Sequence, residues 1–212
     1  MDFSAAAAGW DTERRIKRAG IIADEIAASI NIKDDHNALE FGCGTGLIGI
    51  YLSDRFRHIT LVDSSEGMIK VLEQKLENAG IRNMTAMVCD FCSVSKSNSM
   101  GFQEEAYDVI YTSMAMHHVK DIKALLDTFF SLLKPGGHLC IVDLDKDDGS
   151  FHRLEEDFNG HNGFNQCELQ SMLECSGFAE VSARTFFRDK KLIGNDEVPY
   201  SLFIMTGLRI SP

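Results

Sequence analysis

Three glycines stand at alternate positions in one short stretch of the chain, at Gly42, Gly44 and Gly46. An apolar run typical of a buried strand precedes them, and an apolar run with helical spacing follows. Because glycine has no side chain, the backbone of such a turn can approach a ligand closely, and the start of the helix offers unpaired N–H groups. The stretch therefore predicts a site at which a carboxylate or a phosphate binds.

The same turn also satisfies the dinucleotide-binding pattern G-x-G-x-x-G, through Gly44, Gly46 and Gly49. Asp63 follows about 20 residues later, which is the usual position of the carboxylate that binds the ribose of NAD. The turn alone therefore does not separate a nucleotide-binding oxidoreductase from other enzymes that bind a nucleoside.

Four stretches, in the order of the chain, resemble motifs of the class I S-adenosylmethionine-dependent methyltransferases. Glu40, Gly42, Gly44 and Gly46 match the first motif, E-x-G-x-G-x-G. The other three are Leu-Val-Asp-Ser at 61–64, Val-Cys-Asp-Phe at 88–91 and Lys-Pro-Gly-Gly-His-Leu at 134–139. Because the resemblance extends along roughly the whole chain, it favours a methyltransferase over the oxidoreductase.

The resemblance implies S-adenosylmethionine as cofactor and S-adenosylhomocysteine as product. It implies that the glycines line the methionine and ribose part of the cofactor and that Asp63 accepts both ribose hydroxyls. Asp90 would accept from the adenine amino group beside Phe91, and Met68 is a candidate for packing on the adenine face. The predicted cofactor-binding residues are Glu40, Gly42, Cys43, Gly44, Gly46, Asp63, Ser64, Met68, Asp90, Phe91 and Ser113.

The segment 111–119 follows the predicted fourth strand, where this fold places groups that face cofactor and acceptor. It lacks the D/N-P-P-Y/F signature of enzymes that methylate DNA bases or glutamine amides, and it resembles small-molecule methyltransferases of bacterial quinone biosynthesis, which commonly have histidines at the positions of His117 and His118. A histidine there can act as a general base, although packing or loop positioning is the favoured interpretation. The catalytic residue stays unassigned, and His152, His161 and Phe164 are candidates for an acceptor pocket or lid.

We predict no metal site from the sequence. The acidic run at 143–149 has acidic residues at alternate positions, but Asp148 and Leu154 stand where a calcium loop of the EF-hand type needs Gly and Glu. Cys89 and Cys92 form a single C-x-x-C pair without the second pair that a zinc site normally has. The acidic run therefore reads as a solvated loop, and a divalent metal that assists a catechol-like acceptor remains an alternative. The implied reaction is direct displacement of the methyl group.

Strands and helices alternate along the chain. Predicted strands cover 38–41, 58–62, 84–89, 107–112 and 138–144, with a final antiparallel hairpin near 178–188 and 200–208. Predicted helices begin at Asp11 or Thr12, at Leu47, at Ser65, at Asp121 and at Gln166, and a polar surface loop covers 93–105. The pattern predicts a Rossmann-like α/β fold, a three-layer αβα sandwich whose seven-stranded sheet is mostly parallel.

The whole chain, 1–212, reads as a single domain with three parts. An N-terminal helical segment covers 1–36, the cofactor-binding core covers 37–144, and an acceptor-side loop, helix and hairpin cover 145–212. The first helix has an apolar stripe that includes Ile16, and a basic face that reads as solvated rather than as an anion site. Phe3 and Trp10 resemble an aromatic pair that closes over the cofactor in bacterial members of the family.

Composition limits the classes of partner. The formal net charge is -11, from 21 Lys+Arg against 32 Asp+Glu, which disfavours nucleic acid. No apolar run approaches the roughly 20 residues that span a bilayer, so we expect a cytoplasmic protein. We also expect a monomer or homodimer that acts on a small molecule. A methyltransferase of protein side chains and a non-catalytic cofactor-binding subunit remain alternatives.

Overall fold

The computed structural model describes residues 3–91, 102–155 and 157–210. One seven-stranded sheet forms its centre, in the order β3-β2-β1-β4-β5-β7-β6. Only β7 runs antiparallel to its neighbours. The strands are β1 (Asn37–Phe41), β2 (His58–Asp63), β3 (Met84–Val88), β4 (Tyr107–Ser113), β5 (Leu133–Leu144), β6 (Phe178–Ile193) and β7 (Asp196–Arg209). The predicted mixed sheet with a C-terminal antiparallel hairpin is confirmed.

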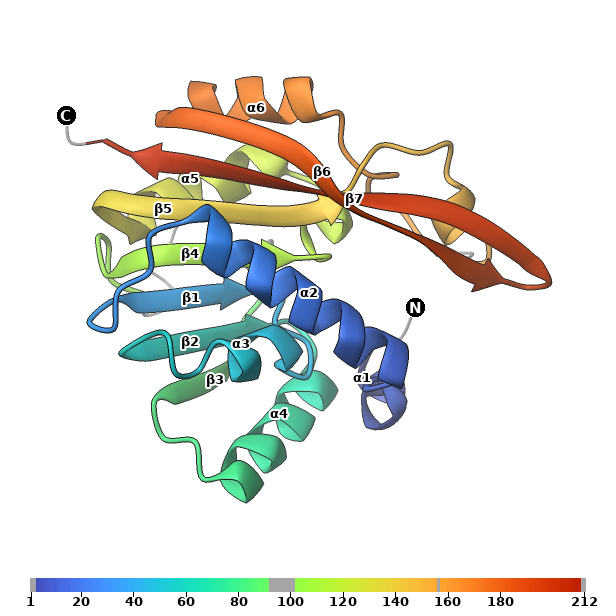
Figure 1. The fold of residues 1–212 in the computed structure, drawn as a ribbon, viewed down its shortest axis with the longest axis horizontal. Helices are drawn as coiled ribbons and strands as arrows, with labels where there is room; N and C mark the ends of the chain where they lie inside the picture. Colours follow the sequence, from blue (N-terminus) through green and yellow to red (C-terminus); the bar gives the residue numbers. More distant parts are fainter. Residues whose placement is uncertain (1–2, 92–101, 156, 211–212) are drawn as a thin grey trace.

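Helices cover both faces of this sheet, so the molecule has three layers (Figure 1). Short elements at the N-terminus and in the loops complete the described chain. The helices are α1 (Phe3–Ala6), α2 (Glu13–Ser29), α3 (Leu47–Tyr51), α4 (Glu66–Ala79), α5 (Ile122–Leu132) and α6 (Gln166–Cys175), and the 3-10 turns are η1 (Ala7–Gly9), η3 (Met116–His118) and η4 (Ser150–His152).

Two hydrophobic clusters separate the layers, one on each face of the sheet. In β5, Cys140 and Val142 pack in the cluster with α2, α3 and α4, whereas Leu139 and Ile141 pack in the cluster with α5 and α6. Successive side chains of a strand point to opposite faces. The apolar runs of the central strands are therefore continuous because both of their faces are buried.

The longer helices begin at the side-chain caps that their sequences indicate. Thr12, Ser65, Asp121 and Asn165 each accept a hydrogen bond from a backbone N–H group in the first turn of α2, α4, α5 and α6. Gly80 ends α4 in the left-handed conformation, as predicted. These caps fix the ends of the helices that lead into and out of the sheet.

Three details of the prediction are wrong. Strand β5 begins at Leu133, which pairs with Tyr107 before the Lys134–Gly137 irregularity, and not at His138. Ile16 is 51% exposed, and the N-terminal end of α2 extends past the ends of β1, β2 and β4 (Figure 1). The β6–β7 hairpin is longer than predicted, and its pairing continues to Ile193 and Asp196, well beyond the part of β7 that pairs with β5.

The predicted surface loop at 93–105 and Cys92 lie wholly or largely outside the described residues. The five cysteines that the structure describes form no disulfide among themselves. Within the described ranges, no helix is both long enough and apolar enough to cross a bilayer.

Candidate active site

A cleft of about 1440 Å³ opens where β1, β2 and β4 end, at the carboxyl edge of the sheet. Such an edge is where open α/β sheets bind ligands. Ten of the eleven predicted cofactor residues line the cleft: Glu40, Gly42, Cys43, Gly44, Asp63, Ser64, Met68, Asp90, Phe91 and Ser113. Gly46 is the exception, because it lies behind the turn as the residue before α3.

The glycine turn depends on two of its glycines for different reasons. Gly42 has a φ of +67°, and a Cβ atom there would lie 2.2 Å from the Cβ atom of Ala115. Gly46 has a φ of +75°, and a Cβ atom there would lie 2.4 Å from a methyl group of Leu72. Both positions therefore exclude other residues. Gly42 brings the turn against the segment after β4, whereas Gly46 lets α3 approach α4.

Asp63 ends β2 and faces the glycine turn across the cleft. Its Oδ2 atom accepts a 2.8 Å hydrogen bond from the backbone N–H of Gly44, and its Oδ1 atom accepts one of 2.9 Å from Ser65. Burial raises the pKa of the carboxyl group, and the two hydrogen bonds oppose that rise. The carboxylate is thus held rigidly at the mouth of the turn.

Glu40 lies deeper, with 2% of its surface exposed. The hydroxyl of Tyr111 donates a 3.2 Å hydrogen bond to Oε2, and the backbone N–H of Gly49 donates a second. Burial raises the pKa of Glu40 to about 8, although both hydrogen bonds lower it. The side chain ties β1 to β4 and to α3 at the floor of the cleft.

Aromatic and thioether groups also line the cleft. Met68 is almost fully buried in the first turn of α4, where Ser65 caps the helix. Phe91 packs edge-on against Phe41 with ring centroids 5.4 Å apart. Asp90 lines the cleft beside Phe91. The carboxylate and the apolar surface together are suited to a flat base with an exocyclic amino group.

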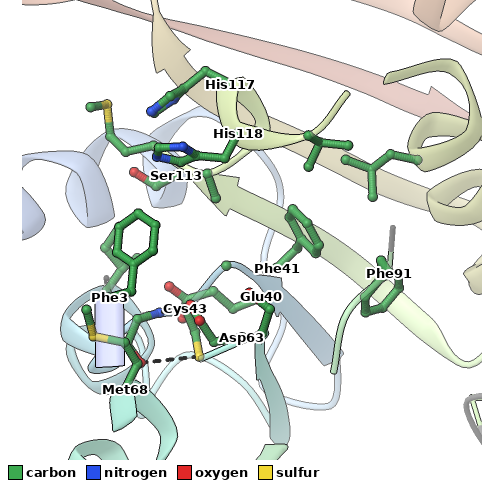
Figure 2. Close-up of a pocket in the computed structure, with 18 of the residues that line it drawn as sticks. Phe3, Glu40, Phe41, Cys43, Asp63, Met68, Phe91, Ser113, His117 and His118 are labelled. Atoms are coloured by element: carbon green, nitrogen blue, oxygen red, sulfur yellow. Dashed lines mark hydrogen bonds between the residues drawn. The ribbon is translucent and has the colours of Figure 1, made fainter. Parts of the chain in front are cut away.

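The N-terminal segment covers this side of the cleft. Phe3 and Trp10 both line it, with ring centroids 5.8 Å apart. The hydroxyl of Ser4 lies 2.9 Å from that of Ser65, so that α1 is attached to the start of α4. Figure 2 shows the ring of Phe3 between Asp63 and Met68 on one side and His118 on the other.

Two histidines after β4 form the opposite wall. His117 is buried, and its Nδ1 atom lies 2.6 Å from a carboxylate oxygen of Asp143, which is fully buried at the end of β5. His118 is exposed to the cleft and its ring lies 5.3 Å from that of Phe3 (Figure 2). His152 joins this wall from η4. His161 and Phe164, the other two pocket candidates, do not line this cleft.

Cationic side chains gather at the end of the cleft formed by α2 and the β6–β7 hairpin. The Arg15 guanidinium lies 3.8 Å from the ring centroid of Trp10, and Arg18 donates a 3.2 Å hydrogen bond to the hydroxyl of Tyr200. Lys191 lies 3.6 Å from Glu155. Burial lowers the pKa of Arg15 and of Lys191, and the positive charge of Arg18 lowers both further. The basic face of α2 thus borders the cleft, contrary to the solvated face that we expected.

Comparison with known proteins decides the family. The profile of a methyltransferase domain matches residues 13–183. The chain belongs to this methyltransferase family. It is a class I S-adenosylmethionine-dependent methyltransferase, as its sequence motifs predicted, and S-adenosylmethionine is its cofactor. The dinucleotide-binding oxidoreductase considered for the glycine turn is thereby excluded.

Two relatives indicate how broad the family is. An uncharacterised methyltransferase of Schizosaccharomyces pombe is 33% identical over 122 residues, which cover 57% of this chain and 43% of the relative. Phosphoethanolamine N-methyltransferase 1 of Arabidopsis thaliana is 28% identical over 164 residues, which cover 75% of this chain and 32% of the relative. The chain thus spans less than half the length of these curated relatives.

Solved structures share the fold of this methyltransferase at low identity. The YcgJ protein of Bacillus subtilis superimposes with a TM-score of 0.72 at 15% identity, over 92% of this chain and 98% of that one. Phosphoethanolamine N-methyltransferase 2 of Haemonchus contortus, solved with phosphomonomethylethanolamine and S-adenosylhomocysteine, gives a TM-score of 0.73 at 15% identity, over 92% of this chain and 53% of that one.

The acidic run of the methyltransferase, at 143–149, does not converge on one point. Asp145 accepts hydrogen bonds of 2.6 Å from Gln166 and 2.6 Å from Ser201, which join the run to α6 and β7. Asp147 accepts a 2.8 Å hydrogen bond from the backbone N–H of Gly149. These carboxylates are hydrogen-bonded within the loop and its neighbours, and they stabilise it.

Four residues of the site were not predicted from the sequence. Lys75 of α4 donates to Asp11 and to the carbonyl oxygen of Thr45, at 2.8 and 2.6 Å, and so attaches the N-terminal segment to the glycine turn. Asp143 was considered only as a calcium ligand. Lys191 and Tyr200 belong to a hairpin whose sequence pattern predicted strand pairing but no site residues. For Asp143 a signal existed, since neighbouring parallel strands end together and β4 leads directly to His117.

Proposed function

We propose that this methyltransferase transfers the methyl group of S-adenosylmethionine to a small molecule that carries an anionic group. The observation that carries the proposal is the combination, in one cleft, of the motif residues at the ends of β1 to β4 with the cationic end formed by Arg15, Arg18 and Lys191. The first part accounts for the cofactor and the second for the acceptor.

The cofactor would bind along the carboxyl edge of the sheet. Gly42 and Gly44 would face its methionine and ribose part, Asp63 would accept from the ribose hydroxyls, and Asp90 with Phe91 would contact the adenine. This placement would direct the sulfonium methyl group toward the wall formed by His117 and His118. Phe3 and Trp10 would cover the bound cofactor and exclude water from it.

The anionic group of the acceptor would bind at the cationic end. In the described part of the chain, no carboxylate lies within 4 Å of the guanidinium of Arg15 or Arg18. A bound anion would neutralise the charges of Arg15 and Arg18, whereas Lys191 already lies 3.6 Å from Glu155. Two relatives are named for phosphoethanolamine, which carries a phosphate, and this supports an acceptor of the same charge. The cationic lining disfavours a basic protein segment as acceptor.

The reaction would be a direct displacement. A lone pair of the acceptor attacks the methyl carbon, the new bond forms in line with the departing sulfur, and the electrons of the C–S bond pass to sulfur, which leaves as the neutral thioether of S-adenosylhomocysteine. Because the sulfonium is already activated, the protein mainly aligns the two reactants and removes water. The cleft walls supply both functions.

Calorimetric titration of the purified protein with S-adenosylmethionine, S-adenosylhomocysteine and NADH tests the cofactor part. We expect micromolar binding of the two adenosyl compounds and none of NADH. Transfer of a labelled methyl group to a panel of phosphorylated, carboxylated and uncharged amines, phenols and thiols then tests the acceptor part. Turnover confined to uncharged acceptors would contradict the proposed anionic class.

A further inference from the structure

Three imidazole side chains meet in the wall of the cleft opposite the cofactor residues. His117 and His118 follow β4, and His152 follows β5. One nitrogen atom from each of the three lies within 4.8 Å of the others. The ring centroid of His117 lies 4.2 Å from that of His118 and 5.1 Å from that of His152. Residues that are more than 30 positions apart in the chain are thus brought to one point.

The ring of His117 is held in the orientation that a metal ligand needs. When its Nδ1 atom donates to Asp143, the lone pair of the ring is on Nε2, away from the carboxylate. Asp143 also accepts hydrogen bonds from the backbone N–H groups of His117 and Leu144, so that its own position is fixed. A buried carboxylate behind a histidine is the common outer partner of metal-binding imidazoles, because it sets the tautomer and raises the basicity of the ring.

The ring of His152 is also fixed, but one of its nitrogens has no partner. It stacks on Phe158 with centroids 3.8 Å apart and an interplanar angle of 5°. The side chain is 5% exposed, and its Nδ1 atom is buried without a hydrogen-bond partner among the described residues. A buried polar atom without a partner is unfavourable unless a ligand or an ion completes the site.

The nitrogen atoms of the three rings are not paired with one another in the described structure. No hydrogen bond joins His117, His118 and His152 to each other within the ranges that the structure describes. A neutral imidazole keeps a lone pair on one ring nitrogen, which it can donate to a cation. Neutral imidazoles beside one buried carboxylate attract a divalent cation.

We propose that His117, His118 and His152 bind a divalent transition metal ion of the zinc type, with Asp143 as the positioning residue behind His117. Zinc–nitrogen bonds of about 2.0–2.1 Å require the three nitrogens to close in by roughly 1 Å. His118 can make this movement because it is exposed to the cleft. Three protein ligands leave the fourth position of a tetrahedral site open toward the cleft.

The metal site would determine the class of acceptor atom, and this part rests on the proposed function. An acceptor hydroxyl or thiol that binds at the open position loses its proton to water more readily, because the cation stabilises the anion. The metal-bound oxygen or sulfur would then attack the methyl carbon, and the electrons of the C–S bond would pass to the cofactor sulfur. No oxidant or reductant is consumed.

Titration of the metal-free protein with Zn²⁺ and Co²⁺ tests the site without any need for an acceptor. We expect one Zn²⁺ per chain with submicromolar affinity, and visible absorption bands of tetrahedral Co²⁺. His117→Ala and His152→Ala should each weaken Zn²⁺ binding at least 100-fold, and Asp143→Asn should weaken it by about 10-fold to 100-fold. His58→Ala, which changes a histidine outside the cleft, is the matched control and should bind Zn²⁺ normally.

Two measurements separate the possible outcomes. Circular dichroism and calorimetric binding of S-adenosylmethionine establish that each variant is folded, and His152→Gln replaces His152→Ala if the latter unfolds. Lack of stoichiometric Zn²⁺ binding by the wild-type protein, or equal binding by the cleft variants and His58→Ala, would overturn the proposal. Zinc binding without any methyl transfer would instead count against the proposed function and leave the metal site standing.

Discussion

The backbone N–H of Gly44 donates a 2.8 Å hydrogen bond to Oδ2 of Asp63, so two motif residues from different strand ends are in direct contact. Ser65 donates to the other oxygen, Oδ1. An ionised carboxylate has about four lone-pair sites. Each oxygen of Asp63 therefore keeps one acceptor position, which is what our proposal that it accepts from both ribose hydroxyls requires.

Asp63→Ala should weaken the binding of S-adenosylmethionine by about 30-fold to 1000-fold, since it removes two charge-assisted hydrogen bonds of roughly 1–2 kcal/mol each. The affinity of Asp63→Asn for S-adenosylmethionine should lie between those of Asp63→Ala and the wild type, because one oxygen acceptor remains. Calorimetric titration measures both. Asp54→Ala, at an exposed carboxylate outside the cleft, is the control, and an unchanged affinity in Asp63→Ala would remove Asp63 from the cofactor site.

Glu40 should make the stability of the protein fall as the pH rises. Its folded-state pKa is about 8, above the ordinary value of 4.5, so the folded protein retains the proton longer than the unfolded chain does. The contribution is complete below about pH 4.5 and is lost as the pH rises through 8, at up to about 1.4 kcal/mol per pH unit. Urea unfolding at pH 5 and at pH 8 measures this slope.

Glu40→Gln should flatten that slope. Between pH 5 and pH 8, its free energy of unfolding should rise relative to that of the wild type by a few kcal/mol. Glu73→Gln, at an exposed position of α4, serves as the control because it removes a carboxyl group without changing a buried one. Equal slopes for the wild type and Glu40→Gln would mean that Glu40 titrates normally in the folded protein.

A pair of glycine substitutions in neighbouring helices should have opposite effects on stability. In Gly49→Ala the new Cβ atom would lie 2.5 Å from Leu61 and 2.6 Å from Glu40, so one buried side chain must move, at roughly 1–3 kcal/mol. In Gly20→Ala the nearest atom, in Tyr51, is 3.5 Å away, and removing a glycine from the interior of α2 should stabilise by about 0.5–1 kcal/mol. Thermal unfolding distinguishes the two, and a destabilised Gly20→Ala would contradict this account.

The half of the cleft that we assign to the cofactor could be predicted from the sequence because each of its motifs is local. A strand, a turn and a helix that are adjacent in the chain position Gly42, Gly44 and Asp63, and the parallel sheet brings their ends together. The acceptor half could not be predicted in the same way. Whether Arg18 faces solvent or a cleft depends on Tyr200, which a hairpin more than 180 residues away places opposite it.

The proximity of His117 and His152 could not be predicted from sequence patterns, for a related reason. The pair belongs to two loops, and only the strand order that puts β4 beside β5 brings those loops to one edge of the sheet. Metal-site spacing rules describe ligands on one loop or helix. They led to the acidic run at 143–149, whose Asp143 instead supports His117 and whose other carboxylates stabilise the loop.

Arg18→Ala should raise the KM for an anionic acceptor by about 10-fold or more, while the affinity for S-adenosylmethionine changes little, because Arg18 lines the cationic end of the cleft, where we propose that the acceptor binds. Lys17→Ala is a matched control, because it removes the same charge from the preceding position of α2. The Lys17 side chain is exposed and does not line the cleft. Steady-state kinetics of both variants at 0.05 M and 0.5 M salt separate a specific contact from a general field, since salt screens distant charges more than direct contacts. If Lys17→Ala and Arg18→Ala raise KM equally, and added salt removes the effect of both, the cationic end attracts anions from a distance without binding the acceptor.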